Sequence, residues 1–134
     1  MRIILLSGGS GKRLWPLSND IRSKQFIKIF KNKESENIIY ESMVQRVYRQ
    51  IKRVIPNADV TIATSKAQVS AIHNQLGKDV GICVEPYHKD TFPAIALATA
   101  YLVDKKGISP HEPVVVCPVD PYVEEDYFES LKRL

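Results

Sequence analysis

The sequence is poor in the residues that mark special environments, and each shortage excludes a class of protein. Its two cysteines, Cys83 and Cys117, are too few for a disulfide scaffold, and their spacing matches no zinc motif. Each lies in a short apolar run, so we expect two buried, reduced thiols. No apolar run approaches the roughly 18 residues of a membrane-spanning helix, and the first apolar segment is too short for a signal peptide. We therefore expect no membrane association and a cytoplasmic location.

Aromatic residues are also scarce, at 8% of the chain, and the basic residues are spread out along it. Because proteins that bind nucleic acids combine basic patches with aromatic side chains, we do not expect a nucleic-acid partner. The 134 residues are 44% apolar and 25% charged, which is typical of a globular protein with a substantial core. The net charge of +4 suits a small anionic substrate.

Short apolar runs alternate with helical patterns along the chain. Buried strands are predicted at 2–7, 60–63, 80–84 and 114–117. Helices are predicted after each of them, at 38–51, 66–76, 91–103 and 127–134. This alternation predicts a Rossmann-like α/β fold with three layers, α/β/α, a mainly parallel sheet and right-handed crossovers.

Two of the predicted helices have specific start signals. Asn37 is the expected N-cap of the first helix, and Thr91 is the expected N-cap of the third. The third helix is apolar on nearly every side, so we expect it to be buried all round.

Glycine-containing or polar segments follow three of the predicted strands, at 7–13, 85–91 and 118–122. Ligands of parallel α/β sheets bind outside the carboxyl ends of the strands. We therefore expect these three segments to converge on one crevice.

The first of these segments reads SGGSGKRLWP and is a candidate phosphate-binding loop. A Walker loop needs a serine or threonine where Arg13 stands, and a dinucleotide-binding loop needs a third glycine where Leu14 stands. No acidic residue closes the second strand, which also disfavours an NAD-dependent oxidoreductase. Both kinds of loop open directly into a helix, whereas Pro16 would break a helix that began at Gly11. An irregular loop that wraps over its ligand is expected instead.

The stretch GGSGKRLWPLSNDIRSKQF resembles the signature of sugar-1-phosphate nucleotidyltransferases, most closely that of mannose-1-phosphate guanylyltransferases. The loop of that family reads G-G-x-G-T-R-L-W-P-L-S and is followed by P-K-Q-F. Lys12 replaces the threonine of the pattern, and Ser23 replaces the proline before the lysine.

Two further stretches carry the same resemblance. EPYHKDTFPAI resembles the family's E-P-x-G-R-N-T-A-P-A-I, with departures at His88, Lys89, Asp90 and Phe92. CPVDPYV resembles P-A-D-H, with Pro121 in place of the histidine. The resemblance implies the fold of nucleotide-diphospho-sugar transferases. It also implies a reaction in which a sugar 1-phosphate attacks the α-phosphate of a nucleoside triphosphate and pyrophosphate leaves.

The resemblance implies a nucleotide site at Gly8, Gly9, Gly11, Lys12, Arg13, Glu85, Pro86 and Thr91. Glycines let backbone amides approach a nucleotide closely, and the forked guanidinium of an arginine suits the outer phosphates. Glu85 is the candidate for base selectivity, because a carboxylate accepts hydrogen bonds from both N1–H and the 2-amino group of guanine. The alternative for Glu85 is a capping or salt-bridging carboxylate.

Such a reaction needs no protein nucleophile, so catalysis consists of positioning and charge stabilisation. The expected catalytic residues are Arg13, Lys24 and Asp120. Lys24 supplies a mobile point charge for the α-phosphate and the departing pyrophosphate, and Asp120 is the expected ligand of Mg²⁺. The alternatives are a solvated surface lysine and a turn aspartate before Pro121.

The expected function is transfer from GTP to mannose 1-phosphate, which gives GDP-mannose and pyrophosphate. Residues 1–134 are expected to form the N-terminal, nucleotide-binding part of a truncated transferase domain that lacks its sugar-binding part and has little activity alone. The departures at Lys89, Asp90 and Pro121 favour an alternative, a non-catalytic nucleotide-binding or regulatory module of the same fold. A truncated sheet would expose an apolar edge, so a homo-oligomer is also considered.

Overall fold

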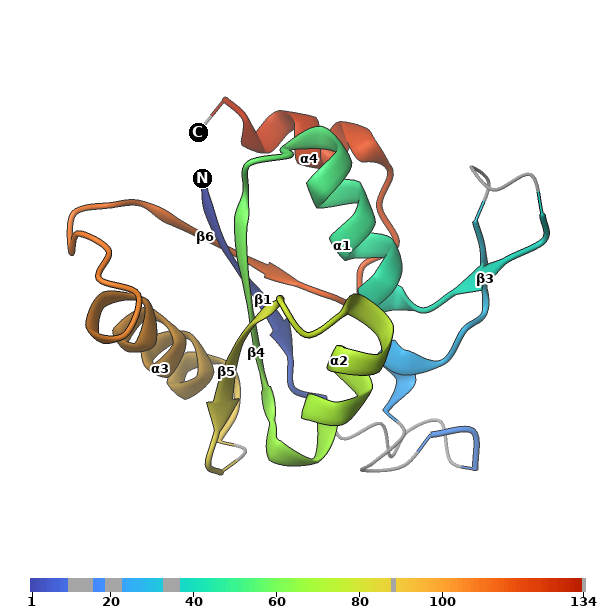
Figure 1. The fold of residues 1–134 in the computed structure, drawn as a ribbon, viewed down its shortest axis with the longest axis horizontal. Helices are drawn as coiled ribbons and strands as arrows, with labels where there is room; N and C mark the ends of the chain where they lie inside the picture. The colour runs from blue at the N-terminus through green and yellow to red at the C-terminus, as the bar shows by residue number, and fades with distance from the viewer. Residues whose placement is uncertain (10–15, 19–22, 33–36, 88, 134) are drawn as a thin grey trace. The chain divides into compact units, whose positions relative to one another are not determined.

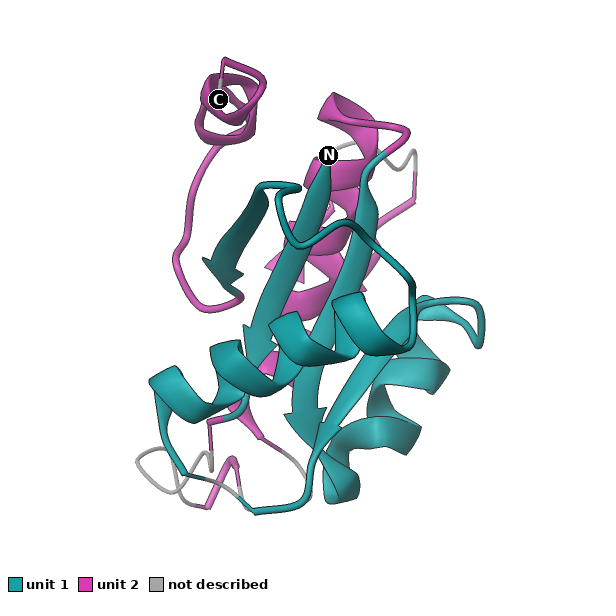
Figure 2. Cartoon of the chain, turned by 90° about the vertical axis from the view of Figure 1, so that its left-hand side faces the viewer, with its two compact units in different colours: residues 1–8, 58–118 teal, residues 9–57, 119–134 magenta. Residues whose placement is uncertain are grey.

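The chain forms two compact units, which Figure 2 shows in different colours. The computed structural model describes residues 1–9, 16–18, 23–32, 37–87 and 89–133. Unit 1 comprises Met1–Gly8 and Ala58–Pro118, and unit 2 comprises Gly9–Asn57 and Val119–Leu134.

Unit 1 is built on a four-stranded parallel sheet (Figure 1). Its strands are β1 (Arg2–Ser7), β4 (Asp59–Ser65), β5 (Gly81–Glu85) and β6 (Val114–Pro118). Their order in the sheet is β5-β4-β1-β6, so the chain adds two strands on one side of β1 before it crosses to the other side. The predicted α/β fold with a mainly parallel sheet is confirmed.

The central strands form because their side chains are apolar on both faces. Ile3, Ile4 and Leu5 of β1 and Ile62 of β4 are fully buried, and Ala63 of β4 is nearly so. Strands that are covered on both faces read as continuous apolar runs, which is why the sequence pattern located them.

Two helices of unit 1 lie on opposite faces of this sheet (Figure 2). One is α2 (Val69–Leu76), which follows the 3-10 turn η3 (Lys66–Gln68) and ends at Gly77 with a φ of 92°. The other is α3 (Thr91–Asp104). A core cluster joins α3 to the sheet and contains Ile4, Ala63, Cys83, Ala98, Leu102 and Ile108. Both cysteines are buried free thiols, as predicted.

Two predictions for α3 are wrong. Asp90 rather than Thr91 is its N-cap, and the Asp90 carboxylate accepts a hydrogen bond from the Thr91 amide at 2.8 Å. The helix is also not buried all round, because only Ala94, Ala98 and Leu102 are buried. These three residues recur every four positions and form one face, and a helix that packs on one sheet buries only that face.

Unit 2 contains a small hairpin and two helices. The hairpin pairs β2 (Phe30–Lys31) with β3 (Tyr40–Glu41) in antiparallel register. The helices α1 (Met43–Val54) and α4 (Glu125–Leu131) contact one another (Figure 1). A short 3-10 helix, η2 (Lys24–Phe26), contacts α1. Among the residues that the structure describes, no helix is long and apolar enough to cross a membrane.

The predicted start of α1 at residue 38 and its Asn37 cap are wrong. The helix begins at Met43, and Ser42 is its N-cap. The Gln45 amide donates to Ser42 Oγ at 3.3 Å, and the Ser42 amide donates to Gln45 Oε1 at 3.1 Å. This reciprocal capping box satisfies two amides that the first turn leaves without partners. The residues before it are free to form β3.

Candidate functional site

Three of the predicted site segments begin at one edge of the sheet in unit 1. Ser7 pairs with Thr64, Ser65 pairs with Glu85, and Leu6 pairs with Pro118. The carboxyl ends of β1, β5 and β6 therefore share an edge. The strand order reverses between β1 and β6, which is where ligands bind in open α/β sheets.

Glu85 lies at this edge as a buried carboxylate with 6% of its surface exposed. Burial raises the pKa of the Cys83 thiol two residues earlier, and the charge of Glu85 raises this pKa further. Pro86 is exposed directly after Glu85. Thr91 is exposed at the first position of α3, and its hydroxyl lies 3.3 Å from Asp90 Oδ1. Of Glu85, Pro86 and Thr91 only Glu85 is buried, and a carboxylate there can accept hydrogen bonds from a ligand.

A buried polar contact holds the end of β1, and sequence reasoning missed it. The Thr64 hydroxyl lies 2.9 Å from Gln68 Oε1 and 3.2 Å from the Ser7 carbonyl oxygen, and all three residues are buried. The contact anchors the point at which the chain enters the glycine loop at Gly8. The signal in the sequence was a polar pair four residues apart, with Thr64 near the end of β4 and Gln68 in η3.

The structure describes only the first two glycines of the loop, Gly8 and Gly9. Gly8 is half-buried and Gly9 is exposed. A Cβ atom added at Gly9 would meet no atom of the described residues within 4 Å, so packing against that part of the chain does not require glycine there. Gly11, Lys12 and Arg13 lie outside the described residues, and their functions stay predictions.

In unit 2 the structure brings together two of the predicted catalytic residues. Lys24 Nζ lies 3.1 Å from Asp120 Oδ2, and the two side chains are 38% and 49% exposed. Lys24 is presented by η2, whose neighbouring residues Gln25 and Phe26 are buried and anchor the turn. Asp120 follows the buried Val119. A half-exposed carboxylate and ammonium group side by side can engage a charged ligand from solvent.

The acidic side of this pair is a single carboxylate. No group of three or more His, Cys, Asp or Glu side chains that could hold a metal ion occurs in the described part of the chain. Mg²⁺ is commonly bound by one or two carboxylates, with substrate phosphates and water completing its octahedral shell. The half-exposed carboxylate of Asp120 fits that kind of site.

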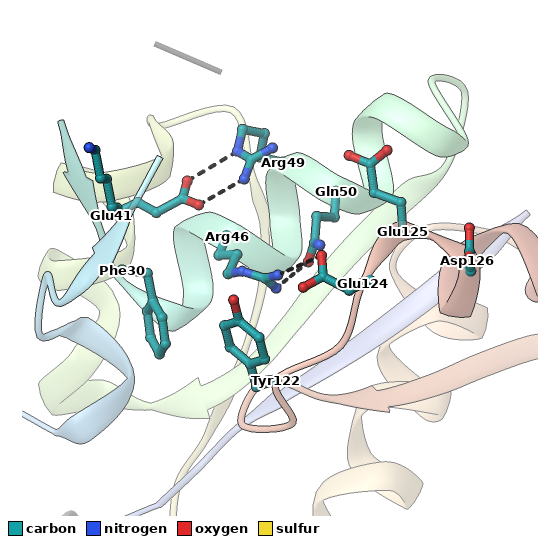
Figure 3. Close-up of a pocket in the computed structure, with 10 residues that line it drawn as sticks. Phe30, Glu41, Arg46, Arg49, Gln50, Tyr122, Glu124, Glu125 and Asp126 are labelled. Carbon is teal, nitrogen blue, oxygen red and sulfur yellow. Dashed lines mark hydrogen bonds and ion pairs between the residues drawn. The ribbon is translucent and has the colours of Figure 1, made fainter. Parts of the chain in front are cut away.

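A cavity of about 410 Å³ also lies within unit 2 (Figure 3). Its lining mixes aromatic, basic and acidic side chains from β2, β3, α1 and the segment before and within α4: Phe30, Lys31, Glu41, Arg46, Arg49, Gln50, Tyr122, Glu124, Glu125 and Asp126. Arg49 donates to both oxygens of Glu41, at 2.8 and 3.1 Å. The Phe30 and Tyr122 ring centroids are 5.7 Å apart. Sequence reasoning did not foresee this cavity, because its walls are distant in the chain.

Comparison with known proteins gives a consistent result. Residues 2–134 match the nucleotidyl transferase family. The alginate biosynthesis protein AlgA of Pseudomonas putida is 32% identical over 135 residues, which cover 97% of this chain and 25% of that protein. A mannose-1-phosphate guanylyltransferase of Escherichia coli is 31% identical over 91% of this chain and 25% of its own length.

The fold has a solved relative as well. A structure from Thermus thermophilus, named as a mannose-1-phosphate geranyltransferase, superposes with a TM-score of 0.75 at 25% identity. The match covers 98% of this chain and 36% of that one. The chain thus spans about a quarter of the length of the curated relatives that it matches.

Proposed function

Because the chain belongs to the nucleotidyl transferase family, we propose that it binds GTP for transfer to mannose 1-phosphate. The products would be GDP-mannose and pyrophosphate. Relatives named as mannose-1-phosphate guanylyltransferases support this choice of nucleotide and sugar. The structural observation that carries the proposal is the pair of Lys24 and Asp120, two predicted site residues whose side chains lie 3.1 Å apart.

The nucleotide is proposed to bind at the carboxyl edge of the sheet. The lack of side chains at Gly8, Gly9 and Gly11 lets the nucleotide approach the backbone closely. Lys12 and Arg13 contact its phosphates. Pro86 and Thr91 lie in the same segment as Glu85. Glu85 accepts hydrogen bonds from N1–H and the 2-amino group of guanine. Its burial supports this function, since a hydrogen bond to a charged acceptor is stronger where water is excluded.

Charge stabilisation is assigned to Arg13, Lys24 and Asp120. A sugar phosphate oxygen attacks the α-phosphorus in line, the bond to the β-phosphate oxygen breaks, and pyrophosphate carries away the electron pair. Lys24 stabilises the negative charge that gathers on the transferred and leaving phosphates. Asp120 would hold Mg²⁺, which when bound neutralises charge on the phosphates.

The 134 residues are proposed to supply the nucleotide-binding part of the transferase, with the sugar-binding part outside them. The chain matches only about a quarter of the curated relatives, which supports this division. We therefore expect nucleotide binding but little or no turnover by this chain alone. A cytoplasmic location and self-association into a homo-oligomer stay predictions.

A non-catalytic nucleotide-binding or regulatory module is the second candidate. One observation favours it: the sequence departs from the family pattern at Lys89, Asp90 and Pro121. Transfer of GTP to mannose 1-phosphate separates the two candidates when Arg13→Ala and Asp120→Ala are placed in the product of the complete reading frame. Loss of transfer in both variants supports the enzyme, whereas nucleotide binding without any Mg²⁺-dependent transfer supports the module.

The choice of nucleotide is tested by thermal shift with GTP, ATP, UTP, CTP and dTTP, each with Mg²⁺. A ligand that binds the folded state raises its stability in proportion to the logarithm of its concentration over its Kd. We expect GTP to give the largest rise in Tm and Glu85→Gln to remove the preference, because the amide offers one acceptor in place of two. An equal rise with every nucleotide, or the same GTP preference in Glu85→Gln, would contradict the proposal.

A further inference from the structure

Two side chains of α1 converge on one backbone carbonyl group in the segment that follows Asp120. Arg46 Nη1 donates to the Val123 carbonyl oxygen at 2.7 Å, and Gln50 Nε2 donates to the same oxygen at 3.2 Å. Arg46 and Gln50 are one helical turn apart on α1, and both are buried. Figure 3 shows their side chains pointing toward this segment.

Arg46 also contacts the residues on either side of Val123. Its guanidinium carbon lies 4.2 Å from the centroid of the Tyr122 ring, and its Nη2 lies 3.3 Å from Glu124 Oε2. Its Nη1 further donates to Gln50 Oε1 at 3.0 Å, which aligns the two side chains with each other. One guanidinium thus binds three consecutive residues through stacking, a carbonyl contact and an ion pair.

The cost of burying this charge indicates a geometric function. The Arg46 side chain is only 9% exposed, and removing a cation from water is unfavourable unless it is well paired. Apolar side chains of similar volume often stabilise a protein as well as a buried ion pair does. The planar guanidinium group has five N–H donors in fixed directions, so it holds its partners in one arrangement. Apolar packing has no such directional preference.

The segment that Arg46 holds begins at the residue after Pro121, which itself follows Asp120 directly. The proline ring fixes its own φ, so few rotations remain between the held segment and Asp120. Holding residues 122–124 therefore restricts the directions in which the Asp120 side chain can leave the backbone. In the structure the direction taken leads to Lys24.

We propose that Arg46 and Gln50 are positioning residues for Asp120, which hold the segment 122–124 so that the Asp120 carboxylate faces Lys24 and the metal-bound phosphates. This inference rests on the proposed function, in which Asp120 holds Mg²⁺. Neither side chain touches the reacting groups. Their effect is on the geometry of the metal site.

The experiment measures the Mg²⁺ concentration that gives half of the maximal rise in Tm at saturating GTP. The variants are Arg46→Met, Arg46→Lys, Gln50→Met and Asp120→Asn in the 134-residue chain. Arg49→Lys is the matched control, because Arg49 lies on the same helix but pairs with Glu41 of the hairpin. The Tm without GTP and Mg²⁺ reports any effect on folding alone.

We expect Arg46→Met to raise the half-effective Mg²⁺ concentration about tenfold, in the range found when groups that orient metal ligands are removed. Arg46→Lys keeps the charge but not the fork, so a smaller rise is expected, and Gln50→Met should also give a rise. Arg49→Lys should give none. If Arg46→Met does not fold, Arg46→Lys and Gln50→Met provide the same comparison.

A structural role alone predicts a different pattern. If the Arg46 and Gln50 variants lower the Tm but leave the half-effective Mg²⁺ concentration unchanged while Asp120→Asn raises it, the positioning function is overturned and the proposed metal site stands. If Asp120→Asn also leaves it unchanged, the proposed metal site falls and the inference falls with it.

Discussion

Lys24 Nζ lies 3.1 Å from Asp120 Oδ2, and 96 positions of the sequence separate the two residues. Both side chains are more than a third exposed, so the pair contributes little to folding stability. The pair places opposite charges together at one point of unit 2. In the proposed reaction the lysine faces the phosphates and the aspartate faces the metal.

Lys24→Met and Asp120→Asn should each change the free energy of unfolding by less than about 1 kcal/mol, because exposed ion pairs are weak. Both should lower transfer by at least about 100-fold in the product of the complete reading frame, because each removes charge stabilisation from the transition state. The measurements are urea unfolding and GDP-mannose formation.

The pair of Lys132 and Glu129 provides the control for these variants. Its atoms lie 2.8 Å apart at similar exposure on the side of unit 2 that includes α4. Lys132→Met should leave transfer unchanged. An equal loss of transfer in Lys132→Met would mean that a change in surface charge, and not the site, explains the effect.

Thr61→Val should stabilise the protein by about 1 kcal/mol, as expected when an unsatisfied buried polar group is removed. Thr61 is fully buried, and its Oγ1 is the single buried side-chain nitrogen or oxygen atom without a hydrogen-bond partner in the described residues. Thr64→Val is the matched control, because the Thr64 hydroxyl does have partners. That variant should destabilise the protein in the same urea titration. If Thr61→Val and Thr64→Val both stabilised the protein, the effect would come from valine in β4 in general and not from the unsatisfied hydroxyl of Thr61.

Gly81→Ala should destabilise the protein by about 1–3 kcal/mol, the usual cost of inserting an atom into a packed site. An added Cβ would lie 3.0 Å from Thr61 Oγ1 and 3.0 Å from the Val60 carbonyl oxygen. The carbonyl belongs to the neighbouring strand and cannot move without distorting the sheet. Gly9→Ala is the control, since its Cβ would meet no atom within 4 Å in the part of the chain that the structure describes. Equal Tm values for Gly81→Ala and Gly9→Ala would contradict this prediction.

The stability of the chain should fall with pH above the ordinary thiol pKa of 9.0. Burial and the charge of Glu85 raise the pKa of Cys83 in the folded state, so above pH 9.0 the unfolded chain releases a proton that the folded chain retains. Unfolding is then favoured, by up to about 1.4 kcal/mol for each pH unit until the folded pKa is reached. Below the ordinary pKa this contribution does not change.

Urea unfolding at pH 8, 9 and 10 measures this dependence, and Cys83→Ala is the comparison. The variant should be less stable at every pH because it leaves a cavity, but its stability should fall less steeply between pH 9 and 10. Burial also raises the pKa of Tyr48, whose ordinary value is 10.0, so higher pH would mix the two titrations. Equal slopes for the two proteins would contradict the assignment to Cys83.

Ser42→Ala should destabilise the protein by about 1 kcal/mol, the typical cost of losing an N-cap. The Ser42 side chain accepts the Gln45 amide in a capping box at the start of α1. Asn37→Ala should change the free energy of unfolding far less, because Asn37 lies outside the helix. If Asn37→Ala destabilised the protein more than Ser42→Ala, the result would support the helix start at residue 38 that the sequence predicted.

The central strands β1 and β4 were predictable because each is a short run buried on both faces. The edge strands β5 and β6 were predictable because they keep short apolar runs although they are only partly buried. The predicted strand at 60–63 lies within the observed Asp59–Ser65, and that at 114–117 lies within Val114–Pro118. Helix starts were less predictable, because apolar residues such as Ile38 and Ile39 continue the helical spacing although they belong to the hairpin region. Their placement depends on the Ser42 capping box and on the pairing of β3 with β2.

The candidate site divides in the same way. The glycine loop, Glu85, Lys24 and Asp120 could be named from the sequence, because motifs at the ends of strands mark where a parallel sheet binds ligands. The burial of Glu85 was not evident, since it depends on the packing around the end of β5. Arg46 and Gln50 gave only the faint signal of polar residues spaced four apart beside an apolar stripe.

The amino-acid sequence alone determined the parallel α/β class and the family. Both depend on local apolar periodicity and short motifs, which can be recognised without knowing which distant residues are in contact. Only the tertiary structure decided that Lys24 meets Asp120 and that Arg46 grips the segment beyond it. The physical reason is that the sequence pattern around a charged side chain is compatible with many different partners. Folding selects among them by bringing together residues that lie far apart along the chain.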